Sequence, residues 1–194
     1  MDSVMSYLAE GFDLPILDWI AANLQCGFLD FIMPIITVLG DAGIFWILLS
    51  LLFLCLPKYR QIGLGMAFSL IFGLLLCNIY MKPTIARIRP YDYQLEHFGK
   101  VVPLLIEVEH DFSFPSGHTI ASFEAATVLL LGNKKLGIPA MILASLIAFS
   151  RLYLYVHYPT DVITSVILGI GIAYLSVYLA KKAFPLLNFK KRPR

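Results

Sequence analysis

The chain has 194 residues, of which 59% are hydrophobic, with a mean hydropathy of +0.78 and a net charge of only +2. Because ordinary soluble domains are roughly 45–50% apolar, this composition indicates a membrane protein. The small net charge gives no electrostatic support to nucleic-acid binding. The length favours a single domain over residues 1–194.

The first predicted element is a helix over residues 14–24, LPILDWIAANL. Its apolar side chains, which include Leu14, Leu17 and Ile20, recur along one face. A helix with one apolar and one polar face is typical of segments that lie in the membrane surface. We therefore expect an amphipathic helix at the interface, ahead of the membrane spans.

Six apolar runs follow, at residues 28–39, 42–56, 61–81, 119–131, 137–155 and 162–180. A bilayer core requires about 20 helical residues, so the shorter runs must tilt or borrow flanking residues to cross it. The sequence thus predicts an all-α membrane protein with about six transmembrane helices. If the run 28–39 does not cross, the count falls to five and the N-terminus lies outside.

Basic residues divide between two sides of the predicted bundle. Ten of the fifteen lie in the segments 57–60 and 132–135 and in the tail after residue 180, which alternation of the spans places on one face. By the positive-inside rule this face, with the C-terminus, is cytoplasmic. Orientation does not require basic residues at the outer face, so an anionic ligand is the simplest reason for those found there. These are Lys82, Arg87, Arg89, Lys100 and Arg151.

Three polar clusters lie at the ends of apolar runs on the outer face. They are KPTIARIRP (82–90), PSGH (115–118) and SRLYLYVHYPTD (150–161). Each alone is explained by an ordinary structural role, such as a helix cap or an interfacial anchor. Together they bring basic residues, two histidines and an aspartate to one patch, which a chance assembly does not explain. We expect the segment 82–117 to be an outer loop that carries part of an active site.

The chemistry of this patch suits a phosphate group. A phosphate monoester carries nearly two negative charges, and Lys82, Arg89 and Arg151 can neutralise it, the arginines through bidentate contacts. Gly117 lets the backbone approach an anion closely, and Ser116 can donate its hydroxyl. The amides that follow Ser116 lie at a predicted helix N-terminus, which favours negative charge.

The two histidines, His118 and His157, suit phosphoryl transfer. One neutral imidazole must attack phosphorus, and one protonated imidazole must give its proton to the leaving oxygen. Asp161 lies in the first turn of a helix begun by Pro159, from which it can fix the tautomer of His157 and leave the other ring nitrogen free to attack. His118 has no carboxylate four residues away, and we predict that it acts as the acid and then as the base that activates water.

These residues together resemble the motifs of the type-2 phosphatidic acid phosphatase superfamily, the integral-membrane lipid phosphate phosphatases. Lys82, six residues and then Arg89-Pro90 is similar to the first motif, and PSGH at 115–118 is similar to the second. Ser150-Arg151, five residues, His157, three residues and Asp161 is similar to the third. Vanadium haloperoxidases share this constellation but are soluble, and the apolar spans argue against one.

The resemblance implies a six-span bundle that hydrolyses its substrate without a metal or another cofactor, through a phosphohistidine on His157. It implies His118 as acid and base and Asp161 as the partner of His157. It also implies a site near the outer leaflet, with a set of residues around the phosphate: Lys82, Arg89, Ser116, Gly117, His118 and Arg151.

The substrate implied by the resemblance is a membrane lipid phosphate or diphosphate. Undecaprenyl diphosphate is preferred because an outward site suits recycling of that carrier; phosphatidylglycerol phosphate and phosphatidic acid are the alternatives. An anion or lipid transporter would explain the basic residues but not two histidines with one carboxylate. An inactivated structural protein would show no turnover, and the sequence does not determine the oligomeric state.

Three features have no assigned role in this chemistry. Arg87 is interpreted as a loop cation. Glu124, inside an apolar run, is expected to make a hydrogen bond to a neighbouring helix. The segment 91–114, rich in acids and histidines, is interpreted as a cap that selects headgroups.

Overall fold

The structure, a computed structural model, describes residues 2–187 and contains helices but no strand in that range. In chain order the elements are α1 (Asp2–Leu8), η1 (Ala9–Asp13), α2 (Leu14–Leu24), α3 (Gly27–Val38), η2 (Asp41–Gly43), α4 (Ile44–Cys55), α5 (Arg60–Gly73), η3 (Leu74–Met81), α6 (Lys82–Ile85), α7 (Pro90–Phe98), α8 (Gly117–Gly132), α9 (Lys134–Tyr153) and α10 (Pro159–Ala183). The all-α class predicted from the sequence is therefore confirmed. The last four basic residues of the tail lie outside the described range.

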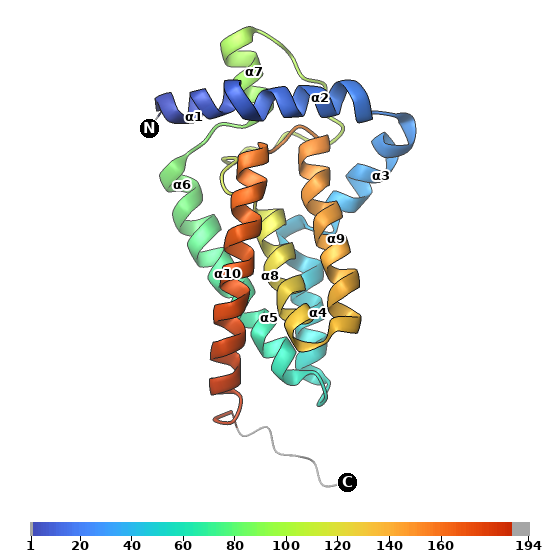
Figure 1. The fold of residues 1–194 in the computed structure, drawn as a ribbon, viewed down its shortest axis with the longest axis vertical. Helices are drawn as coiled ribbons and strands as arrows, with labels where there is room; N and C mark the ends of the chain where they lie inside the picture. The colour runs from blue at the N-terminus through green and yellow to red at the C-terminus, as the bar shows by residue number, and fades with distance from the viewer. Residues whose placement is uncertain (1, 188–194) are drawn as a thin grey trace.

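Helix α8 forms the centre of the bundle, surrounded by α4, α5, α9 and α10 (Figure 1). All of its residues from 119 to 129 are buried except Ala121, as expected for a helix that is apolar on every side. Gly169 of α10 allows the two helices to approach closely, because a Cβ there would lie 3.2 Å from backbone atoms of Ile120 and Glu124. This close packing sets the start of α8 beside the part of α10 from Ser165 to Gly169, and the N–H of Ser116 donates to Ser165 Oγ.

The count of six spans is not confirmed. In residues 2–187, three helical segments are long and apolar enough to cross a membrane: Arg60–Phe98, Lys134–Tyr153 and Pro159–Ala183. A fourth forms if Gly27–Val38 and Asp41–Cys55, which meet at a bend of 41°, make one span. The runs 28–39 and 42–56 thus continue one another instead of folding back, and the central helix α8 has only 16 residues.

The N-terminal rod, defined as α1, η1 and α2 (residues 2–24), lies across one end of the bundle (Figure 1). The apolar face predicted for residues 14–24 exists, since Leu14, Leu17 and Ile20 are buried. They pack in a cluster with protein side chains that include Tyr91 and Tyr153. The apolar face therefore contacts the bundle, and the position of α2 in a membrane surface stays a prediction.

The end of the bundle covered by the N-terminal rod is called the site end. The C-terminal end of α9 and the N-terminal ends of α8 and α10 all lie there, opposite the end of α10 near residue 183 (Figure 1). Helix α10 begins as its sequence predicts, with Pro159 in the first position and Asp161 in the first turn. The fold thus gathers at one end the segments that carry the three sequence clusters.

Candidate active site

A cavity of about 630 Å³ opens at the site end between η2, α4, α5, η3, α8 and the loop before α8. We call it the central cavity. Its polar part is lined by Lys82, Glu109, Asp111, His118 and His157. Its other part is lined mainly by apolar residues of α4, α5, η3 and α8, namely Ile47, Leu70, Leu74 and Ile120. A cavity with one charged and one apolar part suits an amphipathic ligand.

His157 lies in the loop between α9 and α10 and is 1% exposed. Its Nδ1 is 3.5 Å from Asp161 Oδ2 and has no hydrogen-bond partner in the described part of the chain, while its Nε2 is 3.4 Å from Arg89 Nη1. Burial, followed by the positive charges of Arg89 and Arg151, holds the pKa of His157 well below its ordinary value. The imidazole is therefore neutral, as an attacking group must be.

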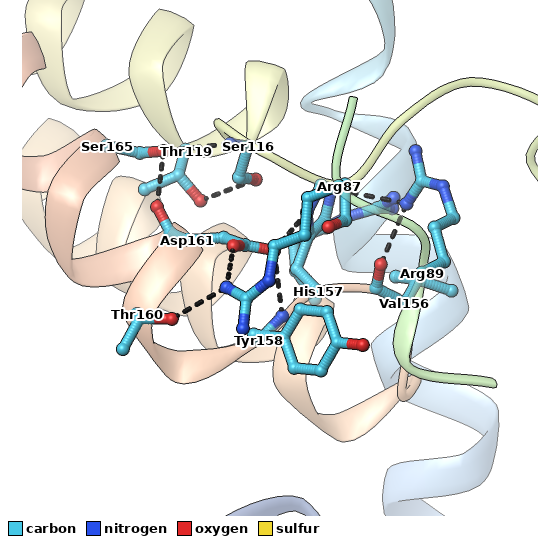
Figure 2. A network of polar contacts seen from close by, with 12 residues as sticks. Arg87, Arg89, Ser116, Thr119, Val156, His157, Tyr158, Thr160, Asp161 and Ser165 are labelled. Atoms are coloured by element: carbon cyan, nitrogen blue, oxygen red, sulfur yellow. Dashed lines mark hydrogen bonds and ion pairs between the residues drawn. The ribbon is translucent and has the colours of Figure 1, made fainter. Parts of the chain in front are cut away.

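Asp161 is fully buried and fixed by the start of α10. Its Oδ2 accepts a hydrogen bond of 3.1 Å from the backbone N–H of Tyr158, and its Oδ1 accepts one of 2.5 Å from Arg87 (Figure 2). A carboxylate at this position satisfies a backbone donor that the helix leaves free. The contact of Asp161 with His157 is thus close but longer than a hydrogen bond in this state.

His118 lies in the first turn of α8, and its Nε2 is 2.7 Å from Asp41 Oδ1. No carboxylate partner for His118 was predicted, because none lies four residues away in the chain. The structure shows that Asp41, from a distant segment, is its partner. Asp41 belongs to η2, which interrupts the apolar residues between α3 and α4. Gly40-Asp41, which interrupts the apolar residues, was the sequence signal from which a carboxylate near the site could have been predicted. A Cβ at Gly40 would lie 2.7 Å from His118 Cδ2, so the glycine makes room for the imidazole.

Lys82, Arg89 and Arg151 approach one another through two carboxylates of the loop before α8. Glu109 pairs with Arg151 and, at 2.5 Å, with Arg89. Asp111 pairs with Lys82 and with Arg89. The cations predicted to hold phosphate are therefore held together around anionic oxygens that come from the protein itself.

Both loop carboxylates are ionised in this arrangement. Burial alone would raise the pKa of Glu109, but the charges of Arg151 and Arg89 outweigh burial and lower it. The pKa of Asp111 is lowered in the same way, with hydrogen bonds from Lys82 and Arg89 outweighing burial. The segment 91–114 was predicted to be a cap. The ion pairs of its Glu109 and Asp111 with Lys82, Arg89 and Arg151 were not predicted.

The two arginines are rigidly held on their other sides. Arg151 is fully buried and donates to Thr37 Oγ1 at 2.7 Å. Its Nε has no hydrogen-bond partner among residues 2–187. Arg89, 1% exposed, donates to the carbonyl oxygens of Val156 at 2.8 Å and Asp111 at 2.9 Å. The contact with Val156 ties Arg89 to the residue that precedes His157.

The PSGH segment contributes unequally to the central cavity. Gly117 and His118 line it, whereas Ser116 is fully buried behind them. The N–H of Ser116 donates to Ser165 Oγ at 2.9 Å, and its hydroxyl accepts from Thr119 at 3.0 Å (Figure 2). A Cβ at Gly117 would lie 3.1 Å from Asn78 Oδ1. Contact of Ser116 with a phosphate therefore stays a prediction.

Glu124 lies deep in the central cavity and is 1% exposed. Its Oε2 makes no hydrogen bond within the described residues, so the expected bond to a neighbouring helix is not found for this oxygen. The carboxylate packs against Gly73, where a Cβ would come within 2.3 Å of it. No group of three or more His, Cys, Asp and Glu in residues 2–187 is placed to hold a metal ion.

Comparison with known proteins identifies the family of the chain. The family model described as the PAP2 superfamily matches residues 62–185. An undecaprenyl-diphosphatase of Sulfolobus acidocaldarius is 33% identical over 170 residues, covering 87% of this chain and 79% of that protein. Phosphatidylglycerophosphatase B of Bacillus subtilis is 32% identical over 157 residues, covering 75% of this chain and 66% of that protein.

A solved structure, the PAP2-type phosphatidylglycerolphosphate phosphatase of Bacillus subtilis, superposes with a TM-score of 0.69 at 25% identity. The superposition covers 100% of this chain and 90% of that one. The family model includes the residues that line the central cavity from Leu70 to His157, but not those before residue 62. The chain belongs to the PAP2 superfamily and is a membrane phosphatase.

Proposed function

We propose that this protein hydrolyses the phosphate or diphosphate group of a membrane lipid, with undecaprenyl diphosphate as the preferred substrate. The observation that carries the proposal is that His157, His118 and Lys82 line one cavity with an apolar extension, and that Arg89 and Arg151 pair with Glu109 at its edge. The undecaprenyl-diphosphatase relative supports the preference, and the phosphatidylglycerophosphatase relatives support phosphatidylglycerol phosphate as the alternative.

In the proposed reaction, Nε2 of His157 attacks phosphorus, and a P–N bond forms as the P–O bond to the leaving group breaks. His118 gives its proton to the leaving oxygen, and Asp41 stabilises the imidazolium before that transfer. A water molecule, deprotonated by His118, then attacks the phosphohistidine and releases inorganic phosphate. With a diphosphate substrate the leaving group is the lipid monophosphate. Lys82, Arg89 and Arg151 stabilise the charge on the transferring group.

The apolar part of the central cavity supports a lipid substrate. Ile47 of α4 and Leu74 of η3 line the cavity and are also 42% and 50% exposed. An alkyl chain attached to a phosphate near His157 would pass between these helices toward the bilayer.

A bound phosphate must take the place of the carboxylates of Glu109 and Asp111 on the cations. Replacing both with their amides, in the variant Glu109→Gln/Asp111→Asn, is expected to strengthen binding of inorganic phosphate. Since the anionic competitors are lost, we expect its inhibition constant to fall about tenfold, which is about 1.4 kcal/mol. The measurement is competitive inhibition of lipid hydrolysis by phosphate in detergent. Glu107→Gln, an exposed change in the same loop, is the matched control.

An unchanged or weaker affinity for phosphate in the double variant would show that the two carboxylates organise the cations instead of competing with the ligand. A lower kcat with a lower inhibition constant would still support displacement, because the two quantities report different steps.

The orientation in the membrane is also a proposal. The segments that contain Lys58 and Lys134 lie at the end of the bundle opposite the site end (Figure 1). The positive-inside rule then places that end and the C-terminus in the cytoplasm, the site end outside, and the N-terminal rod along the outer surface. We propose that residues 1–194 form one domain.

A panel of lipid phosphates tests the proposed function. Purified protein in detergent with a chelator is expected to release phosphate from undecaprenyl diphosphate, phosphatidylglycerol phosphate and phosphatidic acid. We expect kcat/KM for undecaprenyl diphosphate to exceed the others by about tenfold, a difference of about 1.4 kcal/mol in transition-state binding. Binding of these lipids without release of phosphate would favour a transporter, and loss of activity with the chelator would contradict metal independence.

A further inference from the structure

We propose that Arg87 and Asp13 are positioning residues for catalysis. Because Asp13 belongs to the N-terminal rod, the rod then contributes to the active site. Arg87 holds the carboxylate of Asp161 toward His157, and Asp13 holds Arg87. The inference rests on the proposed function, since it assigns His157 and Asp161 their catalytic roles. It concerns two residues that the sequence analysis left out of the reaction.

The guanidinium of Arg87 is enclosed between two buried carboxylates. Its Nη1 donates to Asp161 Oδ1 at 2.5 Å and to Thr160 Oγ1 at 2.8 Å (Figure 2), and its Nη2 donates to Asp13 Oδ2 at 2.7 Å. The ring of Tyr158 lies over it, with the guanidinium carbon 3.6 Å from the ring centroid. Only 4% of the Arg87 side chain is exposed, so solvent screens these contacts little.

Asp13 reaches the same place from the N-terminal rod. It is fully buried, and its Oδ1 accepts from the backbone N–H of Thr160 at 2.9 Å. Its Oδ2 accepts from the hydroxyl of Thr160 at 2.7 Å as well as from Arg87. Thr160 is the second residue of α10. A side chain at residue 13 therefore completes the first turn of the helix that carries Asp161.

The charges explain why Asp161 needs this support. Its carboxylate is fully buried, and an isolated buried carboxylate is strongly disfavoured. The guanidinium of Arg87 compensates the charge, and Asp13 in turn anchors the guanidinium. With Oδ1 occupied by Arg87 and Oδ2 held by the N–H of Tyr158, the lone pairs of Oδ2 are directed to the side where His157 Nδ1 lies 3.5 Å away.

In the proposed reaction this arrangement stabilises the positive charge that develops on His157. An ionised and fixed Asp161 stabilises the imidazole when its Nε2 bonds to phosphorus, because Nδ1–H can then donate to Oδ2. Without Arg87 the carboxylate would take up a proton or turn away. Arg87 lies within the residues matched by the family model, whereas Asp13 lies outside them. The support of Asp161 thus comes partly from a segment that the family model does not include.

The test compares Arg87→Gln, Asp13→Asn and the double variant with the wild type, by kcat and KM for lipid phosphate hydrolysis. We expect each single variant to lower kcat about 10–100-fold, as loss of an orienting partner does, with KM within about twofold because the phosphate-binding cations remain. The kcat of the double variant is expected to be no lower than that of the slower single variant, because both residues act through the same carboxylate. Arg87→Lys keeps the charge but cannot bridge both carboxylates, so its kcat should lie between those of the wild type and Arg87→Gln.

Lys100→Gln is the matched control. It removes an exposed ion pair of 2.9 Å between Lys100 and Asp18 of the N-terminal rod, and we expect kcat to stay unchanged. The inference is overturned if Arg87→Gln leaves kcat intact, if the loss appears in KM, or if the two single losses simply multiply in the double variant. It is also overturned if Arg87→Lys does not fold, or if its kcat is no higher than that of Arg87→Gln. A wild type inactive on every lipid phosphate would instead overturn the proposed function.

Discussion

Replacing His157 with Ala is expected to reduce phosphate release from a lipid phosphate by at least about a thousandfold, because in the proposed reaction His157 forms the covalent intermediate. The neutral state of this imidazole follows from its burial and from the cations beside it, which lower its pKa. The acid limb of kcat/KM for the wild type is therefore expected below about pH 6.5, the ordinary pKa of histidine. Above that limb His157 is free to attack.

His97→Ala is the control for this experiment. His97 is exposed on α7 and stacks on Tyr93 with ring centroids 3.9 Å apart, so its loss should leave phosphate release unchanged. Residual activity of His157→Ala above about a tenth of the wild type would assign the attack to another group. An acid limb well above pH 6.5 would contradict a neutral His157 in the free enzyme.

Replacing Arg89 with Gln is expected to lower kcat/KM by about 10²–10³-fold, or about 3–4 kcal/mol, as loss of a donor aimed at developing charge does. Arg89 contacts both loop carboxylates and lies 3.4 Å from His157 Nε2, so it is placed beside the phosphorus that His157 attacks. Arg89→Lys should recover part of the loss, since it keeps the charge but not the fork of two donors. Steady-state hydrolysis of the preferred lipid is the measurement.

Lys58→Gln, at the opposite end of the bundle, is the control for loss of a positive charge and should leave kcat/KM unchanged. Because Arg89 also donates to Val156, the melting temperature of each variant in detergent must be measured alongside. A folded Arg89→Gln variant with wild-type kcat/KM would remove Arg89 from the phosphate site. Full activity of Arg89→Lys would show that charge alone suffices.

The all-α class could be predicted because the apolar runs are long and alternate with polar breaks. Alternation placed Lys82, His118 and His157 at one end, and the structure shows all three lining one cavity. The span count was harder to predict, since the runs 28–39 and 42–56 could fold back or continue each other. Sequence spacing does not determine the bend of 41° between Gly27–Val38 and Asp41–Cys55.

The partners of the site residues were the part that sequence could not provide. Asp161 was predicted as the neighbour of His157 because it lies four positions later in the chain, and the helix start brings the two side chains close. Asp41, Glu109 and Asp13 reach their partners from distant segments. No local pattern marks such contacts, because they depend on how α8, the loop before it and the N-terminal rod pack together.

The most direct test of a phosphoryl group transferred to His157 is to trap the intermediate. The enzyme would be mixed with its lipid substrate, quenched within milliseconds at alkaline pH, and digested for mass spectrometry. The account predicts one phosphate on the peptide that contains His157 and none in His157→Ala. Turnover without a phosphorylated peptide, or with the phosphate on His118, would contradict it.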